Sequence, residues 1–267
     1  MRFSNALSWP VFILAVTAFT AGCSSKHAHR HPTMTSAPPV NVSKLASKAF
    51  DQFKAKTPLD EDPRANAYVV CVAEAVVRNI GGDWGIALFR RDASHAFVLP
   101  GGKIGVYSGL LRTTRNQHQL AAIIAHGLAH VIARHPDLRV AEQMRLHPGT
   151  DLMRALDRPS SAEGQLVMDL LGVEPDGGQG MPFGRAQESA ANVLGLDLMA
   201  RAGFDPKESI NVWKSLERGS GTRLGLLAMH PSYGSRVTEF EQHLPAATAL
   251  QSQSLAGRKK PECDRLR

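Results

Sequence analysis

Residues 117–135, QHQLAAIIAHGLAHVIARH, constrain the fold of this chain more than any other stretch. The apolar residues would lie on more than one side of a helix, which is typical of a helix buried in the centre of a domain. The sequence therefore predicts a central helix around which the other elements pack. His126 and His130 would lie on one face of that helix about one turn apart, so both imidazoles can point at the same metal ion.

A second strong helical pattern, RAQESAANVLGLDLMARAG over residues 185–203, adds a carboxylate to the two histidines. A pair of histidines at this spacing is weak evidence by itself. Two histidines and one carboxylate, however, are the protein ligands of many catalytic zinc sites, which keep a fourth position open. We therefore expect His126, His130 and Glu188 to hold one zinc ion. Asn192, one turn after the glutamate, is expected to accept a hydrogen bond from one of these histidines.

The remaining patterns predict an α+β fold that is mainly helical, in one domain over residues 41–248 followed by a C-terminal tail, residues 249–267. Residues 83–92, DWGIALFRRD, form a strand candidate, and residues 94–111, SHAFVLPGGKIGVYSGLL, show a strand, a Pro-Gly-Gly turn and another strand. These segments indicate a small antiparallel sheet. Residues 177–184, GGQGMPFG, are expected to form a loop. Further helical patterns cover residues 43–53, 65–80, 206–221 and 232–244.

The N-terminal residues resemble a sorting signal rather than part of the domain. The apolar segment of residues 9–20 is too short to span a bilayer as a stable helix. Thr-Ala-Gly-Cys at residues 20–23 resembles a bacterial lipobox. We expect a signal peptide over residues 1–22, a lipid on Cys23 and a polar, Pro-rich disordered tether over residues 23–40. Lipoprotein sorting rules then indicate the periplasmic face of the outer membrane, and an ordinary cleaved signal peptide is the alternative.

The charge balance is basic, with a formal net charge of +7 and an isoelectric point of about 9.6. A basic balance can indicate a nucleic-acid partner. The basic residues are scattered, however, and no run of Lys and Arg is interleaved with aromatic residues as in a groove that binds single strands. We therefore expect no nucleic-acid partner, and an acidic membrane surface is the more natural counterpart.

Three cysteines are present. If Cys23 carries the lipid, Cys71 and Cys263 are left as an even pair in an oxidising compartment. We expect a disulfide that ties the C-terminal tail to an early helix. The alternative is a buried free thiol at Cys71 and an unpaired thiol in the tail.

Four segments, in this order, resemble the periplasmic zinc metallopeptidases of the BepA and LoiP type, in metallopeptidase family forty-eight, with LoiP the closest. Residues 96–111, AFVLPGGKIGVYSGLL, are similar to the family's Asn-Ala-Phe-x-x-Pro-Gly-Gly hairpin. Residues 117–135 are similar to its zinc helix, and residues 185–206 to its Arg-x-x-Glu-x-x-Ala-Asp helix. Residues 228–236, AMHPSYGSR, are similar to its Thr-His-Pro segment with a following arginine. The resemblance covers roughly residues 60–248 and implies a zincin-like (gluzincin) domain.

The resemblance implies a role for several single residues. His126, His130 and Glu188 match the family's three zinc ligands. His230 matches a late histidine near the metal, which acts there as an extra ligand or as an oxyanion partner. The family's zinc helix carries H-E-x-x-H, and Gly127 occupies the position of its catalytic glutamate.

Two further departures are milder. Asn192 occupies the position of an aspartate, and its carboxamide oxygen can still accept a hydrogen bond, though without charge. His95 replaces the asparagine before the hairpin.

These departures leave three hypotheses. The first is a zinc-binding but catalytically impaired peptidase homologue in envelope quality control, in which the edge strand HAFVL or KIGVY holds unfolded or misassembled envelope proteins. The second is an active zinc metalloendopeptidase in which His230 or a substrate group carries the proton. The third is a scaffold without zinc. A positioned general base contributes roughly 10²- to 10⁴-fold to such a reaction, and glycine offers no side chain for it.

Overall fold

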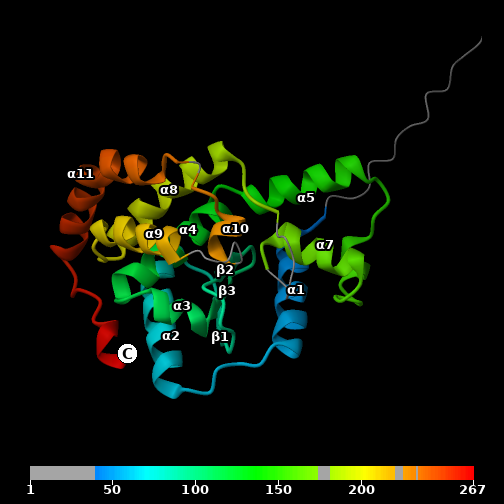
Figure 1. Cartoon of the computed structure of the whole chain (residues 1–267), viewed down its shortest axis with the longest axis horizontal. Coiled ribbons are helices and arrows are strands. Elements are labelled where there is room, and N and C mark those ends of the chain that lie inside the picture. Colours follow the sequence, from blue (N-terminus) through cyan, green and yellow to red (C-terminus); the bar gives the residue numbers. More distant parts are fainter. Residues whose placement is uncertain (1–39, 174–180, 220–224, 233) are drawn as a thin grey trace, which may run out of the picture. The chain divides into compact units, whose positions relative to one another are not determined.

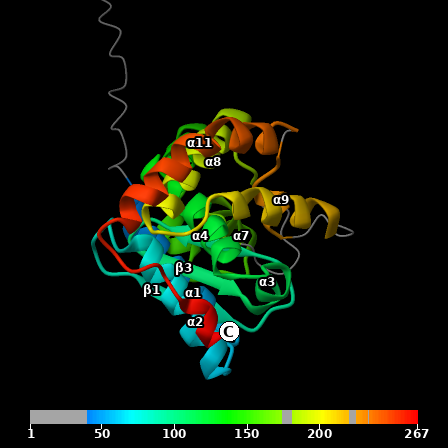
Figure 2. The same cartoon turned by 90° about the vertical axis from the view of Figure 1, so that its left-hand side faces the viewer.

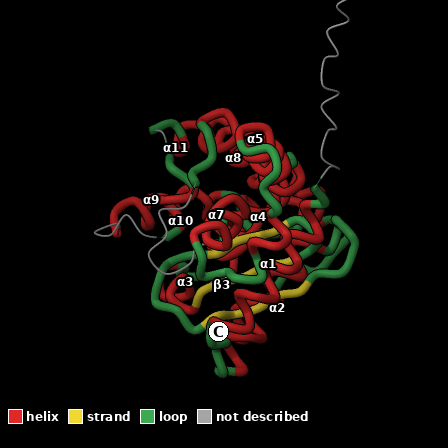
Figure 3. Tube along the Cα trace, turned by 90° about the vertical axis from the view of Figure 1, so that its right-hand side faces the viewer, coloured by secondary structure: helices red, strands yellow, loops and turns green. Residues whose placement is uncertain are grey.

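The computed structural model describes residues 40–173, 181–219, 225–232 and 234–267. The predicted signal peptide, Cys23 and the tether up to residue 39 lie outside these residues, as do residues 177–180 of the predicted loop. The described chain is mainly helical around one small sheet, as the sequence predicts (Figure 3). None of its helices combines the length and the apolar character that a membrane span requires.

The sheet is mixed rather than antiparallel throughout. Strands β2 (Ala96–Leu99) and β3 (Lys103–Tyr107) form the predicted hairpin, and Gly101 and Gly102 in its turn have φ angles of 83° and 75°, which glycine adopts readily. Strand β1 (Gly85–Phe89), however, pairs in parallel with β3, in the strand order β1-β3-β2. After β1 the chain skips the position next to β1 and forms β2 one strand further on; β3 then occupies the position between them. Because β3 is central, KIGVY is not an edge strand; β2, which contains most of HAFVL, lies at one edge of the sheet and β1 at the other.

The two faces of the sheet belong to two separate cores. Ala96 and Val98 of β2 pack into the core on one face, while Phe97 and Leu99 pack into the core on the other face. This alternation follows from the two-residue period of a strand. Helix α2 (Pro63–Val77) covers the first face and α1 (Val42–Lys56) the second (Figure 1).

The central helix is α4 (Gln117–Ile132), and most of its side chains are buried. Its first turn is capped by Asn116, whose side-chain oxygen accepts from the N–H groups of His118 and Gln119, both at 3.0 Å. Arg134, with a φ of 58°, turns the chain into the next helix. Helix α4 lies between β2 and α8 (Arg185–Arg201) (Figures 1 and 2). The sequence prediction of a buried central helix is confirmed.

The other helices surround this centre. Helix α11 (Arg236–Leu255) continues past residue 248, the predicted end of the domain. The remaining elements are α3 (Ser108–Thr113), α5 (His135–Leu146), α6 (Leu152–Ala155), α7 (Ala162–Leu171), α9 (Lys207–Gly219), α10 (Leu226–Met229), α11 (Arg236–Leu255) and a 3-10 helix (Cys263–Leu266).

The last residues fold back against α2 and the start of α4. Cys71 in α2 forms a disulfide with Cys263, which is the pairing expected from the sequence. The N–H of Gln117 donates to Asp264 Oδ1 at 2.8 Å, and Gln117 Oε1 accepts from the N–H of Cys263 at 2.6 Å. The C-terminal residues therefore help to cap the central helix that carries the two histidines.

Candidate metal centre

Four side chains from three parts of the chain converge at the middle of α4. His126 and His130 come from α4, Glu188 comes from the first turn of α8, and His230 follows α10 directly. One nitrogen or oxygen atom from each lies within 4.8 Å of the others, and all four residues are buried. The structure thus brings together the three expected ligands and the additional histidine.

The spacing of these atoms fits a tetrahedral zinc site. His126 Nε2 lies 3.3 Å from Glu188 Oε2, and His130 Nε2 lies 3.3 Å from Glu188 Oε1. The Nε2 atoms of the two histidines of α4 are 3.2 Å apart. Zinc–nitrogen bonds of about 2.0–2.1 Å place two tetrahedral donors roughly 3.3–3.4 Å apart. A zinc ion would therefore fit between these donors with little movement of the side chains.

The protonation states also suit a cation. Burial lowers the pKa of His126 to about 4, so its imidazole is neutral and a ring nitrogen can act as a ligand. Burial by itself would raise the pKa of Glu188, but the electrostatic interaction with His230 and hydrogen bonds from His126, His130 and His230 outweigh it and hold this pKa well below its usual range. The site therefore combines neutral imidazole with an ionised carboxylate.

Arg236, at the start of α11, positions this carboxylate, and the sequence analysis assigned it no role. It is fully buried, and its Nη2 donates to Glu188 Oε2 at 2.7 Å and to the carbonyl oxygen of His230 at 2.9 Å. Its guanidinium carbon lies 3.8 Å from the centre of the Trp213 ring. The arginine after the His-Pro pair in residues 228–236 was the sequence feature that could have indicated this contact.

The prediction for Asn192 is wrong in its partner. Its side-chain oxygen accepts from Arg236 Nε at 3.2 Å, and its amide donates to Glu239 Oε2 at 2.7 Å. Asn192 lies one turn after Glu188 on the side of α8 that packs on α11, so it faces the arginine rather than the histidines of α4. It acts on the site through Arg236.

The partner of His130 is another histidine. His135 Nδ1 lies 2.9 Å from His130 Nδ1, so either ring can donate to the other. His135 is the last residue of the helical pattern over residues 117–135, but it lies five residues after His130, and helical spacing gives no reason to pair them. His126 Nδ1 is buried without a hydrogen-bond partner among the described residues.

Gly127 faces β2, and no carboxylate occupies its position. A Cβ atom there would lie 2.9 Å from Val98 Cγ2. Gly127, Val98, His130 and His230 line a cavity of about 20 Å³, which is room for about one water molecule. Within the described residues of the cluster Glu188 is the one carboxylate, and it already contacts Arg236. The site thus has donors for a metal ion, and Gly127 contributes no side chain to it.

Gly195 sets the distance between the two helices that carry the ligands. A Cβ atom on Gly195 would lie 2.9 Å from the Cα and 3.1 Å from the backbone nitrogen of His126. Only a residue without Cβ lets α8 approach the backbone of α4 this closely. The carboxylate two turns earlier in α8 thereby reaches both histidines.

The comparisons with known proteins agree with this geometry. The chain matches the profile of Peptidase family M48 over residues 61–244. Mitochondrial metalloendopeptidase OMA1 of Schizosaccharomyces pombe is 34% identical over 168 residues, which are 61% of this chain and 48% of that protein. Beta-barrel assembly-enhancing protease of Yersinia pestis is 28% identical over 201 residues, 70% of this chain and 40% of that protein. The matched part is thus less than half the length of these relatives.

Proposed function

Because the chain belongs to peptidase family M48, we propose that it binds one zinc ion and that its hydrolysis of peptide bonds is impaired at Gly127. His126, His130 and Glu188 would hold the ion, with His230 or water in the fourth position. When bound, zinc supplies a Lewis acid and acidifies a coordinated water molecule. The observation that carries the proposal is that side chains able to bind zinc occupy every ligand position, whereas residue 127, directly after His126, is a glycine.

The proposed impairment concerns one proton transfer. A carboxylate at position 127 would take a proton from water and pass it to the leaving amine, and a positioned base contributes roughly 10²- to 10⁴-fold. Glycine cannot do either. Glu188 cannot replace that base, because its two oxygens already face the histidines and Arg236.

A second candidate is an active metalloendopeptidase in which His230 carries the proton. His230 Nδ1 lies 2.9 Å from Glu188 Oε1, and the ring lines the water-sized cavity beside Gly127. The His230 imidazole is therefore within reach of a water molecule in the cavity. This position favours His230 as the proton carrier over a side chain outside the cavity.

We also propose the cellular setting that the sequence indicates. A lipid on Cys23 would hold the domain at the periplasmic face of the outer membrane, and the name of the bacterial relatives, beta-barrel assembly-enhancing protease, agrees with an envelope role. Clients would be unfolded or misassembled envelope proteins that pair with the backbone of β2 (Ala96–Leu99), which lies at the edge of the sheet beside α4. The particular likeness to LoiP is part of this proposal.

The test of zinc binding is elemental analysis of the purified chain after mild dialysis. We expect about one zinc ion per chain, and we expect His126→Ala to lose most of it because one of three protein donors is removed. Metal-free wild-type protein, or zinc content that His126→Ala leaves unchanged, would contradict the proposal.

The test of impairment is to restore the glutamate. Gly127→Glu should raise the zinc-dependent cleavage of a casein-like unfolded protein, and Gly127→Gln is the matched control, with the same size but no base. Because a side chain at position 127 meets Val98, the double variant Gly127→Glu/Val98→Ala should recover more activity if the methyl group blocks the carboxylate. Strong cleavage by the wild type, abolished by His130→Ala and not increased by Gly127→Glu, would support the proton carrier at His230 instead.

A further inference from the structure

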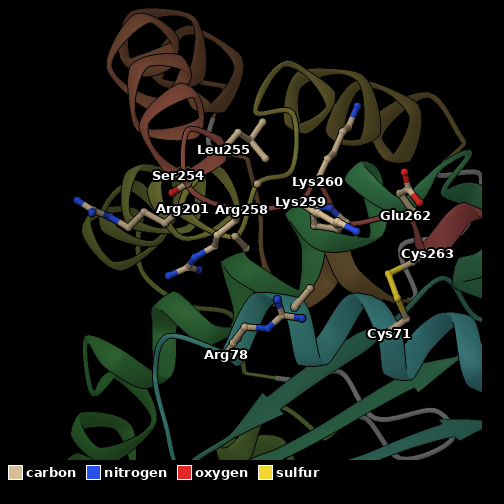
Figure 4. A pocket seen from close by; sticks show the side chains of 14 residues that line it. Cys71, Arg78, Arg201, Ser254, Leu255, Arg258, Lys259, Lys260, Glu262 and Cys263 are labelled. Atoms are coloured by element: carbon tan, nitrogen blue, oxygen red, sulfur yellow. A yellow bond between two sulfur atoms is a disulfide. The ribbon is translucent and has the colours of Figure 1, made fainter.

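A cavity of about 240 Å³ lies at the opposite end of α8 from the metal centre. It is bounded by the C-terminal ends of α2, α8 and α11 and by residues 258–263, which cross above α2 (Figure 4). Glu188 is in the first turn of α8 and Arg201 in the last. At a rise of 1.5 Å per residue these two residues are about 20 Å apart. The cavity is therefore separate from the proposed zinc site.

Positive charge dominates the lining of this cavity. None of its basic residues forms a salt bridge with a carboxylate in the part of the chain that the structure describes. Glu262 is the one acidic residue in the lining, and it pairs with Arg265 outside the lining. The basic lining residues are Arg78, Arg201, Arg258, Lys259 and Lys260.

Three of these side chains lie nearest to α2. Figure 4 shows Arg78, Arg258 and Lys259 between α2 and the segment above it, with their charged groups apart, while Arg201 and Lys260 extend away from this space. Arg258 Nη1 donates to Asn79 Oδ1 at 3.0 Å, which leaves its other guanidinium N–H groups available. Arg78, Arg258 and Lys259 supply hydrogen-bond donors for a ligand, and the other two cations add to the positive potential of the cavity.

The partial negative charges at the C-terminal ends of the three helices offset only part of this positive charge. The C-terminus of a helix carries about half a negative charge, so three of them offset about one and a half positive charges. The five cations exceed that amount by more than a factor of three. The surplus is the property expected of a site that binds an anion.

The disulfide fixes the shape of the cavity. Cys71 and Cys263 both line it, and their bond holds the segment that carries Arg258 and Lys259 over α2. The basic side chains therefore start from a backbone that is already in place, which lowers the entropic cost of binding.

We propose that this cavity binds a phosphate-bearing anion. Guanidinium and ammonium groups are the usual protein partners of phosphate, and two arginines with a lysine supply both the planar and the compact kind of donor. The cavity is smaller than pockets for drug-sized ligands, so it suits a single phosphate group, either free or in the headgroup of an anionic lipid. The proposal does not depend on zinc or on peptidase activity.

The test uses the full chain with Cys23→Ala throughout, so that no attached lipid contributes to binding. The site variant is Arg78→Gln/Lys259→Gln, and the matched control is Lys54→Gln/Arg154→Gln, which removes the same charge from exposed residues of α1 and α6. In the first arm inorganic phosphate is titrated at constant ionic strength by calorimetry. We expect saturable binding by the wild type and the control, and at least fivefold weaker binding by the site variant.

The second arm measures sedimentation with vesicles of zwitterionic lipid, with and without anionic phospholipid. A cation at an anionic surface contributes about 1 kcal/mol, a factor of about five, so loss of two should weaken binding about 25-fold in the site variant only. Binding in the first arm alone assigns a free phosphate as the ligand, and binding in the second alone assigns a lipid headgroup. Binding in neither arm, or equal losses in the site variant and the control, would overturn the proposal.

Discussion

Replacing Gly195 with alanine tests whether the close approach of α4 and α8 sets the metal centre. The added Cβ atom would lie 2.9 Å from the Cα and 3.1 Å from the nitrogen of His126, and 3.3 Å from the carbonyl carbon of Ala125. All three are backbone atoms of a buried helix and cannot rotate away. The helices must therefore separate, and Glu188 must move away from the histidines.

Two opposing effects decide the magnitude. Alanine gains about 1 kcal/mol over glycine inside a helix. Overpacking of a well-packed core costs about 1–3 kcal/mol, and contact with backbone favours the upper part of that range. We expect Gly195→Ala to lower the free energy of unfolding by about 1–2 kcal/mol. Zinc affinity should fall about 10- to 100-fold, as it does when a residue that orients a ligand is lost.

The assay pairs urea unfolding of the metal-free protein with competition for zinc against a chelator. Gly127→Ala is the matched control, because it makes the same helical substitution in α4 but meets the side chain of Val98, which can adjust. We expect a smaller loss of stability there and an unchanged affinity for zinc. A Gly195→Ala protein as stable as the wild type and with equal zinc affinity would refute the account of the helix spacing.

Three further predictions concern other parts of the chain. Burial lowers the pKa of His95 to about 3, so as the pH falls the unfolded chain binds this proton before the folded chain does. The free energy of unfolding should therefore fall by about 1.4 kcal/mol per pH unit between about pH 6.5 and pH 3. In His95→Asn the free energy of unfolding should depend less steeply on pH across this range. The disulfide of Cys71 and Cys263 spans 192 residues, so Cys71→Ser/Cys263→Ser should lose about 5 kcal/mol by the loop-entropy relation, and an unchanged urea midpoint would exclude this contribution. Cys23→Ala should move the protein from the membrane fraction to the soluble periplasm, and continued membrane association would indicate another anchor.

Local patterns predicted the parts of the fold that depend on one segment. The apolar residues of α4 required a buried helix, and the Pro-Gly-Gly sequence after β2 required a tight turn. The parallel pairing of β1 (Gly85–Phe89) could not be read in the same way, because neighbouring strand candidates are equally consistent with several orders in a sheet. Strand order depends on which faces the flanking helices bury, and that is a property of the whole domain.

The site shows the same division. The spacing of His126 and His130 on one helix identified two ligand positions, whereas contacts between different helices were not visible in the spacing. Arg236 reaches Glu188 from another helix, and it takes the oxygen of Asn192 that was expected to serve a histidine. A hydrogen bond between side chains of different helices depends on how those helices pack, and the spacing of residues within one helix does not reveal that packing.

The order in which the chain is synthesised restricts when its disulfide can form. Cys263 follows Cys71 by 192 residues, so α2 is complete long before its covalent partner exists. During that interval Cys23 is the one other cysteine already made. If its sulfur carries the predicted lipid, it cannot react with Cys71, and the correct pairing is the single one left within the chain. Lipidation would thus protect a bond formed much later, and the cationic cavity above α2 would be among the last parts of the domain to form.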